Sequence, residues 1–83
     1  YILFKRNVAD RDQLRALTDS LRTLDGRNDL PILIDQEGGR VARMTPPEWP
    51  AFPPGADFGV LYEKAPASAI EAARHNAHAL GLM

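Results

Sequence analysis

Two continuous apolar runs with an amphipathic segment between them constrain the fold of this chain most. Residues 1–4 read Tyr-Ile-Leu-Phe, and residues 30–34 read Leu-Pro-Ile-Leu-Ile. A strand that is buried on both faces shows no alternation of polar and apolar residues, so both runs indicate strands of a parallel sheet. Pro31 is compatible with this interpretation, because the first residue of a strand need not donate a ladder hydrogen bond.

The segment between the two runs predicts a helix. Asp10 is a typical N-cap residue, and Gln13 stands at the capping-box position three residues later. Gly26 can adopt the left-handed conformation that closes a last helical turn. Leucines recur at spacings of three and four, and we expect this stripe to be core: Leu14, Leu17, Leu21 and Leu24. Strand, helix and strand in this order predict a βαβ unit with a right-handed crossover.

A parallel sheet this apolar needs cover on both faces, which a chain of 83 residues with no cysteine cannot supply alone. The chain also starts at Tyr1, inside an apolar run, rather than at a methionine. We therefore expect a piece of a larger protein, with the remainder of the same polypeptide chain as its packing partner.

Composition excludes several classes of function. The formal net charge is -1, which argues against nucleic acid and membrane surfaces as partners. No apolar run approaches the roughly 20 residues that cross a bilayer. No cluster of cysteine and histidine suggests a structural zinc, and we expect no metal and no cofactor. The absence of cysteine and of a recognisable signal is compatible with a cytoplasmic location.

Residues 38–64 hold five of the seven prolines and are expected to form a long loop. Trp49, Phe52 and Phe58 lie among these prolines, which indicates a loop that packs on the body of the protein. Stacking of Trp49 and Phe52 on sugar rings is the alternative.

A second helix is expected from near Ala67. The expected buried face consists of Ile70, Ala73, Ala77 and Leu80. His75 and His78 stand three residues apart on this helix. A plain role on the helix surface is favoured over an acid/base role, because a metal pair or a general acid would need carboxylate neighbours and a cleft.

The residues that carry chemistry lie in the stretch from Ile34 to Arg43. Asp35 follows the second apolar strand directly, and ligands of parallel α/β proteins bind at the carboxyl ends of strands. Gly38 and Gly39 permit a sharp turn or the close approach of a ligand. A carboxylate can accept from vicinal hydroxyls, and the guanidinium of Arg43 offers several donors. Asp35 and Arg43 are therefore the candidate sugar-binding residues.

Other interpretations of these side chains remain open. Asp35 could be a buried carboxylate that caps a loop, or could form with Glu37 a glycosidase pair or a magnesium site. A catalytic pair from a single strand end is disfavoured, because the two carboxylates must flank the scissile bond. We expect Glu37 and Arg40 to form a buried salt bridge or brace beside Asp35. Arg6 and Asn7 are expected to hold the loop after the first strand, and a place in the wall of the subsite is the alternative.

The run Asp35-Gln36-Glu37-Gly38-Gly39-Arg40-Val41, preceded by Ile2-Leu3-Phe4 and Arg6-Asn7, resembles the bacterial β-N-acetylhexosaminidases of glycoside hydrolase family 3. The resemblance implies an α/β fold: residues 1–83 would be a partial glycosidase catalytic domain, a fragment of a (β/α)8 TIM barrel around its second and third strands. One departure is Ala42, where the family often has glutamine.

The resemblance also implies roles for individual residues. Asp35 would bind hydroxyls of a terminal N-acetylglucosamine, and Arg43 would belong to the same subsite. The family is retaining, with a nucleophilic aspartate late in the barrel and an acid/base histidine on a mobile loop. Both lie downstream, so no catalytic residue is assigned to this chain, and the fragment alone is expected to be inactive.

The implied function is hydrolysis of terminal non-reducing N-acetyl-β-D-glucosamine from cell-wall muropeptides, in peptidoglycan recycling. The partner would be a saccharide that contains N-acetylglucosamine. The alternatives are a family 3 β-glucosidase and a non-catalytic sugar-binding relative.

Overall fold

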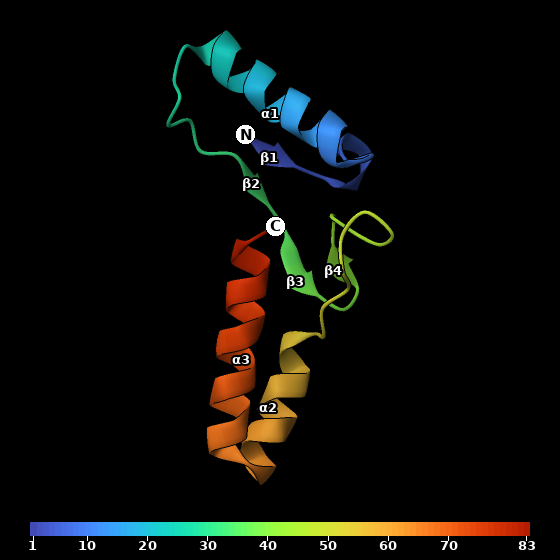
Figure 1. Cartoon of the computed structure of the whole chain (residues 1–83), viewed down its shortest axis with the longest axis vertical. Helices are drawn as coiled ribbons and strands as arrows, with labels where there is room; N and C mark the ends of the chain where they lie inside the picture. The colour runs from blue at the N-terminus through green and yellow to red at the C-terminus, as the bar shows by residue number, and fades with distance from the viewer. The chain divides into compact units, whose positions relative to one another are not determined.

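The computed structural model describes residues 1–83, which form two compact units (Figure 1). The first unit comprises Tyr1–Asp35 and the second comprises Gln36–Met83. Each unit contains both helix and strand, so the chain is a small mixed α/β structure. This agrees with the expected α/β class.

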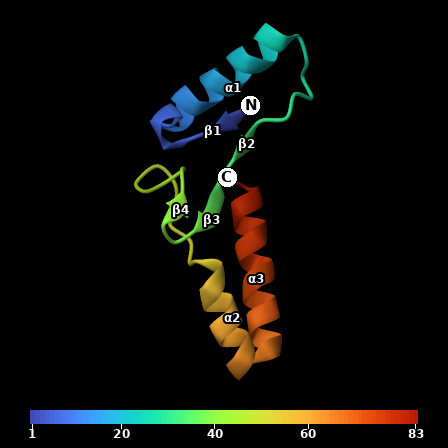
Figure 2. The ribbon, with the colours of Figure 1, turned by 180° about the vertical axis from the view of Figure 1, so that it is seen from behind.

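The first unit is a βαβ unit, as predicted. Its two strands pair in parallel, with Ile2 opposite Leu33 and Leu3 opposite Ile34. Helix α1 connects them and runs alongside β1 (Figure 2). The strands are shorter than the apolar runs that predicted them. The elements are β1 (Ile2–Leu3), the 3-10 helix η1 (Lys5–Asn7), α1 (Arg11–Asp25) and β2 (Leu33–Ile34).

The predicted caps of α1 are confirmed. The Asp10 side chain accepts a hydrogen bond from the Gln13 backbone N–H at 2.8 Å. The Gln13 side chain returns toward the helix start, where its Oε1 accepts from the Ala9 N–H at 2.8 Å. At the other end Gly26 has φ 73°, and its N–H donates to the Arg22 carbonyl oxygen. The Asp10 side chain therefore sets the start of this helix, and the left-handed backbone of Gly26 sets its end.

The first unit leaves one face of its sheet open. Leu3 is buried, with 6% of its surface exposed, whereas Ile2 and its cross-strand neighbour Leu33 are 58% and 55% exposed. Within the first unit, the helix and the connecting segments therefore do not cover both faces of the parallel pair. The leucine stripe of α1 is core in part: Leu14, Leu17 and Leu21 are half-buried. Leu24 is 79% exposed, so its assignment to the core was wrong. It lies in the last turn of a 15-residue helix that packs beside strands of two residues.

The second unit contains a β-hairpin followed by two helices that lie side by side (Figures 1 and 2). The expected loop over residues 38–64 was wrong in part, because α2 occupies its last ten residues. Pro54 is the N-cap of this helix and Gly55 is its first residue. A proline at the start of a helix interrupts no helical hydrogen bond. The predicted start of the last helix is confirmed. The elements are β3 (Gln36–Gly38), β4 (Val41–Ala42), α2 (Gly55–Lys64) and α3 (Pro66–Gly81).

The buried face of α3 differs from the expected one. Ala69 is buried, and Ala72 and Asn76 are half-buried. Of the four expected residues, Ile70, Ala73 and Ala77 are exposed and Leu80 alone is half-buried. Alanine occurs all around α3, so apolar spacing did not distinguish the face that packs against α2.

None of the three α-helices combines the length and the apolar character that a bilayer-spanning helix requires.

Candidate functional site

Asp35 directly follows β2 and is the last residue of the first unit. Its side chain is exposed in this structure. The position is the carboxyl end of a parallel strand, which is where α/β proteins place ligand-binding side chains.

The residues after Asp35 form an irregular hairpin at the start of the second unit. Strands β3 and β4 are antiparallel, with Gln36 opposite Ala42 and Gly38 opposite Val41. The register moves by two residues along β3 while it moves by one residue along β4. Glu37 is therefore the extra residue of a β-bulge. The hairpin was not predicted, because its strands are only three and two residues long.

The two glycines of the hairpin are required by its backbone. Gly38 and Gly39 have φ values of 92° and 57°, in the region that favours glycine. Each is also closely approached by residues 46–54, the proline-aromatic segment that precedes α2. A Cβ on Gly38 would overlap the carbonyl oxygen of Pro53, and one on Gly39 would lie 2.9 Å from Cβ of Pro54. The close approach that the glycines permit is thus made by this protein's own loop.

Arg43 follows β4 and is half-buried, with its Nε atom buried. Its backbone N–H donates to Oε1 of Gln36 at 3.0 Å. Gln36 was not singled out as a functional residue from the sequence. Its position beside Asp35 was the available signal, but the run gave no indication that its side chain bonds back to residues 43 and 44.

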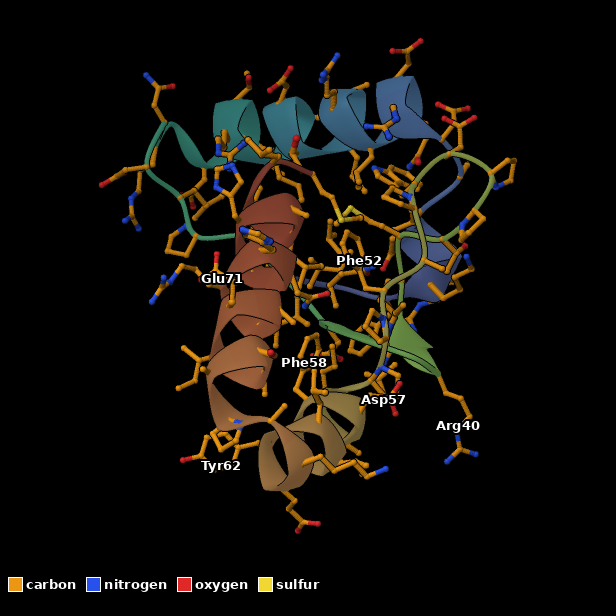
Figure 3. The ribbon with its side chains drawn as sticks, turned by 60° about the horizontal axis from the view of Figure 1, so that its bottom comes forward. Arg40, Phe52, Asp57, Phe58, Tyr62 and Glu71 are labelled. Atoms are coloured by element: carbon orange, nitrogen blue, oxygen red, sulfur yellow. The ribbon has the colours of Figure 1, made fainter.

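Glu37 and Arg40 do not form the expected buried salt bridge. Both side chains are exposed, and no ion pair joins them. Arg40 lies in the turn and extends away from the hairpin (Figure 3). The prediction of a buried salt bridge was therefore wrong, because both side chains are exposed.

Two aromatic residues of the loop, Trp49 and Phe52, differ in how far they are buried. Trp49 is 4% exposed, and its backbone N–H donates to the Thr45 carbonyl oxygen at 3.2 Å. Phe52 is half-buried, and its carbonyl oxygen accepts from the Gly39 N–H. Trp49 therefore packs the loop, as was favoured over stacking on a sugar.

Arg6 and Asn7 hold the turn after β1, as expected. Oδ1 of Asn7 accepts from the Phe4 N–H at 2.9 Å, and the Asn7 carbonyl oxygen accepts from Nε2 of Gln13 at 2.8 Å. The guanidinium carbon of Arg6 lies 4.8 Å from the ring centroid of Phe4. Their contacts in this unit are structural.

The two histidines lie on the exposed surface of α3. Nε2 of His75 is 3.1 Å from Oε1 of Glu71, one helical turn earlier, and His78 is exposed. This confirms the surface role. No group of three histidine, aspartate or glutamate side chains is arranged to hold a metal ion.

No protein-family model matches the chain. Curated proteins named β-hexosaminidase do match it. The protein of Xanthomonas oryzae pv. oryzae is 42% identical over 76 residues, and that of Stenotrophomonas maltophilia is 41% identical over 76 residues. Each match covers 92% of this chain. The protein of Bordetella pertussis is 38% identical over 79 residues, or 95% of the chain. The chain spans 22% of the length of these relatives. The resemblance inferred from the residues is confirmed over this segment.

Proposed function

Because the chain is homologous to one segment of the bacterial β-hexosaminidases, we propose that it forms part of the sugar-binding subsite of a glycoside hydrolase. The observation that carries the proposal is Asp35, an exposed carboxylate at the carboxyl end of a parallel strand, followed by a hairpin that holds Arg43. The carboxylate accepts hydrogen bonds from sugar hydroxyls, and the guanidinium donates to sugar oxygens.

The proposed architecture is the region around the second and third strands of a (β/α)8 barrel, with residues 1–83 as a part of the catalytic domain. The parallel pairing of β1 and β2 through α1 supports it, because that connection is the repeating unit of such a barrel. The exposed side chains of Ile2 and Leu33 also support it, because a barrel strand is covered on both faces.

The proposed reaction is retaining hydrolysis of terminal non-reducing N-acetyl-β-D-glucosamine, with cell-wall muropeptides as the substrate class. The chain contributes binding to this reaction and no nucleophile. Charge-assisted hydrogen bonds to a sugar contribute about 1.5–3 kcal/mol each, so the two residues account for a large share of the affinity for one monosaccharide.

The test uses the complete polypeptide that contains this segment. Steady-state hydrolysis of aryl N-acetyl-β-D-glucosaminide is compared with hydrolysis of the matching aryl β-D-glucoside. The proposal predicts a higher kcat/KM for the N-acetylglucosaminide and retention of the β configuration in the first product. Preference for the glucoside would instead support a β-glucosidase, and no turnover of either would support a sugar-binding protein.

A further inference from the structure

The side chain of Gln36 makes three hydrogen bonds to the backbone of the two residues that follow β4. Its Oε1 accepts from the Arg43 N–H and from the Met44 N–H, each at 3.0 Å. Its Nε2 donates to the Met44 carbonyl oxygen at 2.8 Å. One carboxamide thus binds three backbone groups of adjacent residues, and all three bonds are partly buried.

These hydrogen bonds bind the backbone of the two residues that follow the end of the β3–β4 ladder. The ladder pairs Gln36 with Ala42, and β4 ends at Ala42. Residue 43 lies beyond the ladder, and its backbone N–H bonds to the Gln36 side chain. Because Gln36 bonds to both N–H groups and to the following carbonyl, it fixes the backbone dihedral angles between Arg43 and Met44.

We propose that Gln36 is a positioning residue for Arg43 in sugar binding. The inference rests on the proposed function, in which the Arg43 guanidinium donates to the substrate. The Nε atom of Arg43 is buried, so the side chain leaves the backbone in a packed position. A rotation of the backbone at residue 43 would move the far end of this long side chain, and binding groups must be held within about 0.5 Å of their productive geometry.

Substitutions at Gln36 separate its contacts. Gln36→Leu keeps the approximate volume and removes all three hydrogen bonds. Gln36→Glu keeps an acceptor for both N–H groups, but it loses the bond donated to the Met44 carbonyl and turns a carboxylate toward that oxygen. We therefore expect the order of kcat/KM to be wild type, then Gln36→Glu, then Gln36→Leu.

The experiment is a double-mutant cycle in a complete β-hexosaminidase that contains this segment, assayed with an aryl N-acetyl-β-D-glucosaminide. Gln36→Leu is expected to lower kcat/KM about tenfold, mainly through KM, because it disturbs binding rather than the reacting groups. Arg43→Ala is expected to have an effect at least as large. The double variant should match Arg43→Ala within about twofold, because Gln36 acts through the arginine.

Gln13→Leu is the matched control. Gln13 is also a half-buried glutamine, and its carboxamide also bonds two backbone groups, the Ala9 N–H and the Asn7 carbonyl. It lies in the first turn of α1, and its carboxamide bonds to neither Arg43 nor Met44. Gln13→Leu and Gln36→Leu should both lower the melting temperature, while kcat/KM falls in Gln36→Leu alone.

Additive losses in the double variant, or wild-type kcat/KM in Gln36→Leu, would overturn the inference while leaving the proposed function intact. If Gln36→Leu does not fold, Gln36→Glu takes its place in the same cycle, and an unchanged KM in that variant would overturn the inference as well. Absence of turnover in the wild-type enzyme contradicts the proposed function itself, and the inference with it.

Discussion

The backbone N–H of Gly39 donates to the carbonyl oxygen of Phe52 across 2.8 Å. This bond joins the turn of the β3–β4 hairpin to the proline-aromatic segment that precedes α2. The absence of a Cβ on the adjacent Gly38 lets the carbonyl of Pro53 approach the same turn. The glycine pair therefore determines how the loop docks on the hairpin that presents Arg43.

Replacing Gly38 by alanine should destabilise the protein more than replacing Gly26 does. Both glycines have positive φ, which costs alanine about 1–2 kcal/mol. A Cβ at Gly26 meets nothing within 4 Å, whereas a Cβ at Gly38 overlaps the Pro53 carbonyl. We expect Gly38→Ala to lose a further 1 kcal/mol or more, on the order of an overpacking cost. Denaturant unfolding of a complete polypeptide containing both positions gives the comparison, and equal losses would contradict this role of Gly38.

Leu3 should be the residue of β1 whose truncation costs most. It is the buried member of this strand, and a Leu→Ala change at a core position costs about 2–5 kcal/mol. Leu3→Met conserves the volume and should cost less than about 1.5 kcal/mol. The two free energies of unfolding are measured under the same conditions. Similar losses in both variants would show that shape, rather than cavity formation, dominates at this position.

Removal of the N-cap of α1 should have an intermediate effect. Asp10→Ala leaves the Gln13 N–H without its side-chain acceptor, which costs about 0.5–2 kcal/mol. Asp10→Ser provides another capping oxygen and should restore most of this loss. Thermal unfolding monitored by circular dichroism measures both, and failure of serine to restore stability would indicate that Asp10 contributes through more than this hydrogen bond.

The first unit could be predicted closely because its signals are local. Asp10 specifies the start of α1 through its side chain, and Gly26 specifies its end through its left-handed backbone. The two apolar runs specify a parallel pair. Those runs are longer than the strands, since residues such as Tyr1 and Ile32 lie outside the ladder.

The second unit could not be predicted in the same way because its structure depends on contacts between distant residues. The β3–β4 hairpin depends on the Gln36 side chain and on the docking of Phe52, neither of which has a periodic signal. Helix α2 begins in a proline-rich segment, and the alanines of α3 do not mark one face. Asp35 was identified because it follows an apolar strand directly, whereas the contacts of Gln36 required the structure.

The most direct test of the account is the effect of Asp35→Ala on hydrolysis of an aryl N-acetyl-β-D-glucosaminide by the complete polypeptide that contains this segment. Asp19→Ala, which removes an exposed carboxylate from α1, is the matched control. Loss of a charged partner of the sugar should lower kcat/KM by about 10- to 100-fold, while the control stays within about twofold of wild type. Wild-type kcat/KM in Asp35→Ala would contradict the assignment of this strand end to sugar binding.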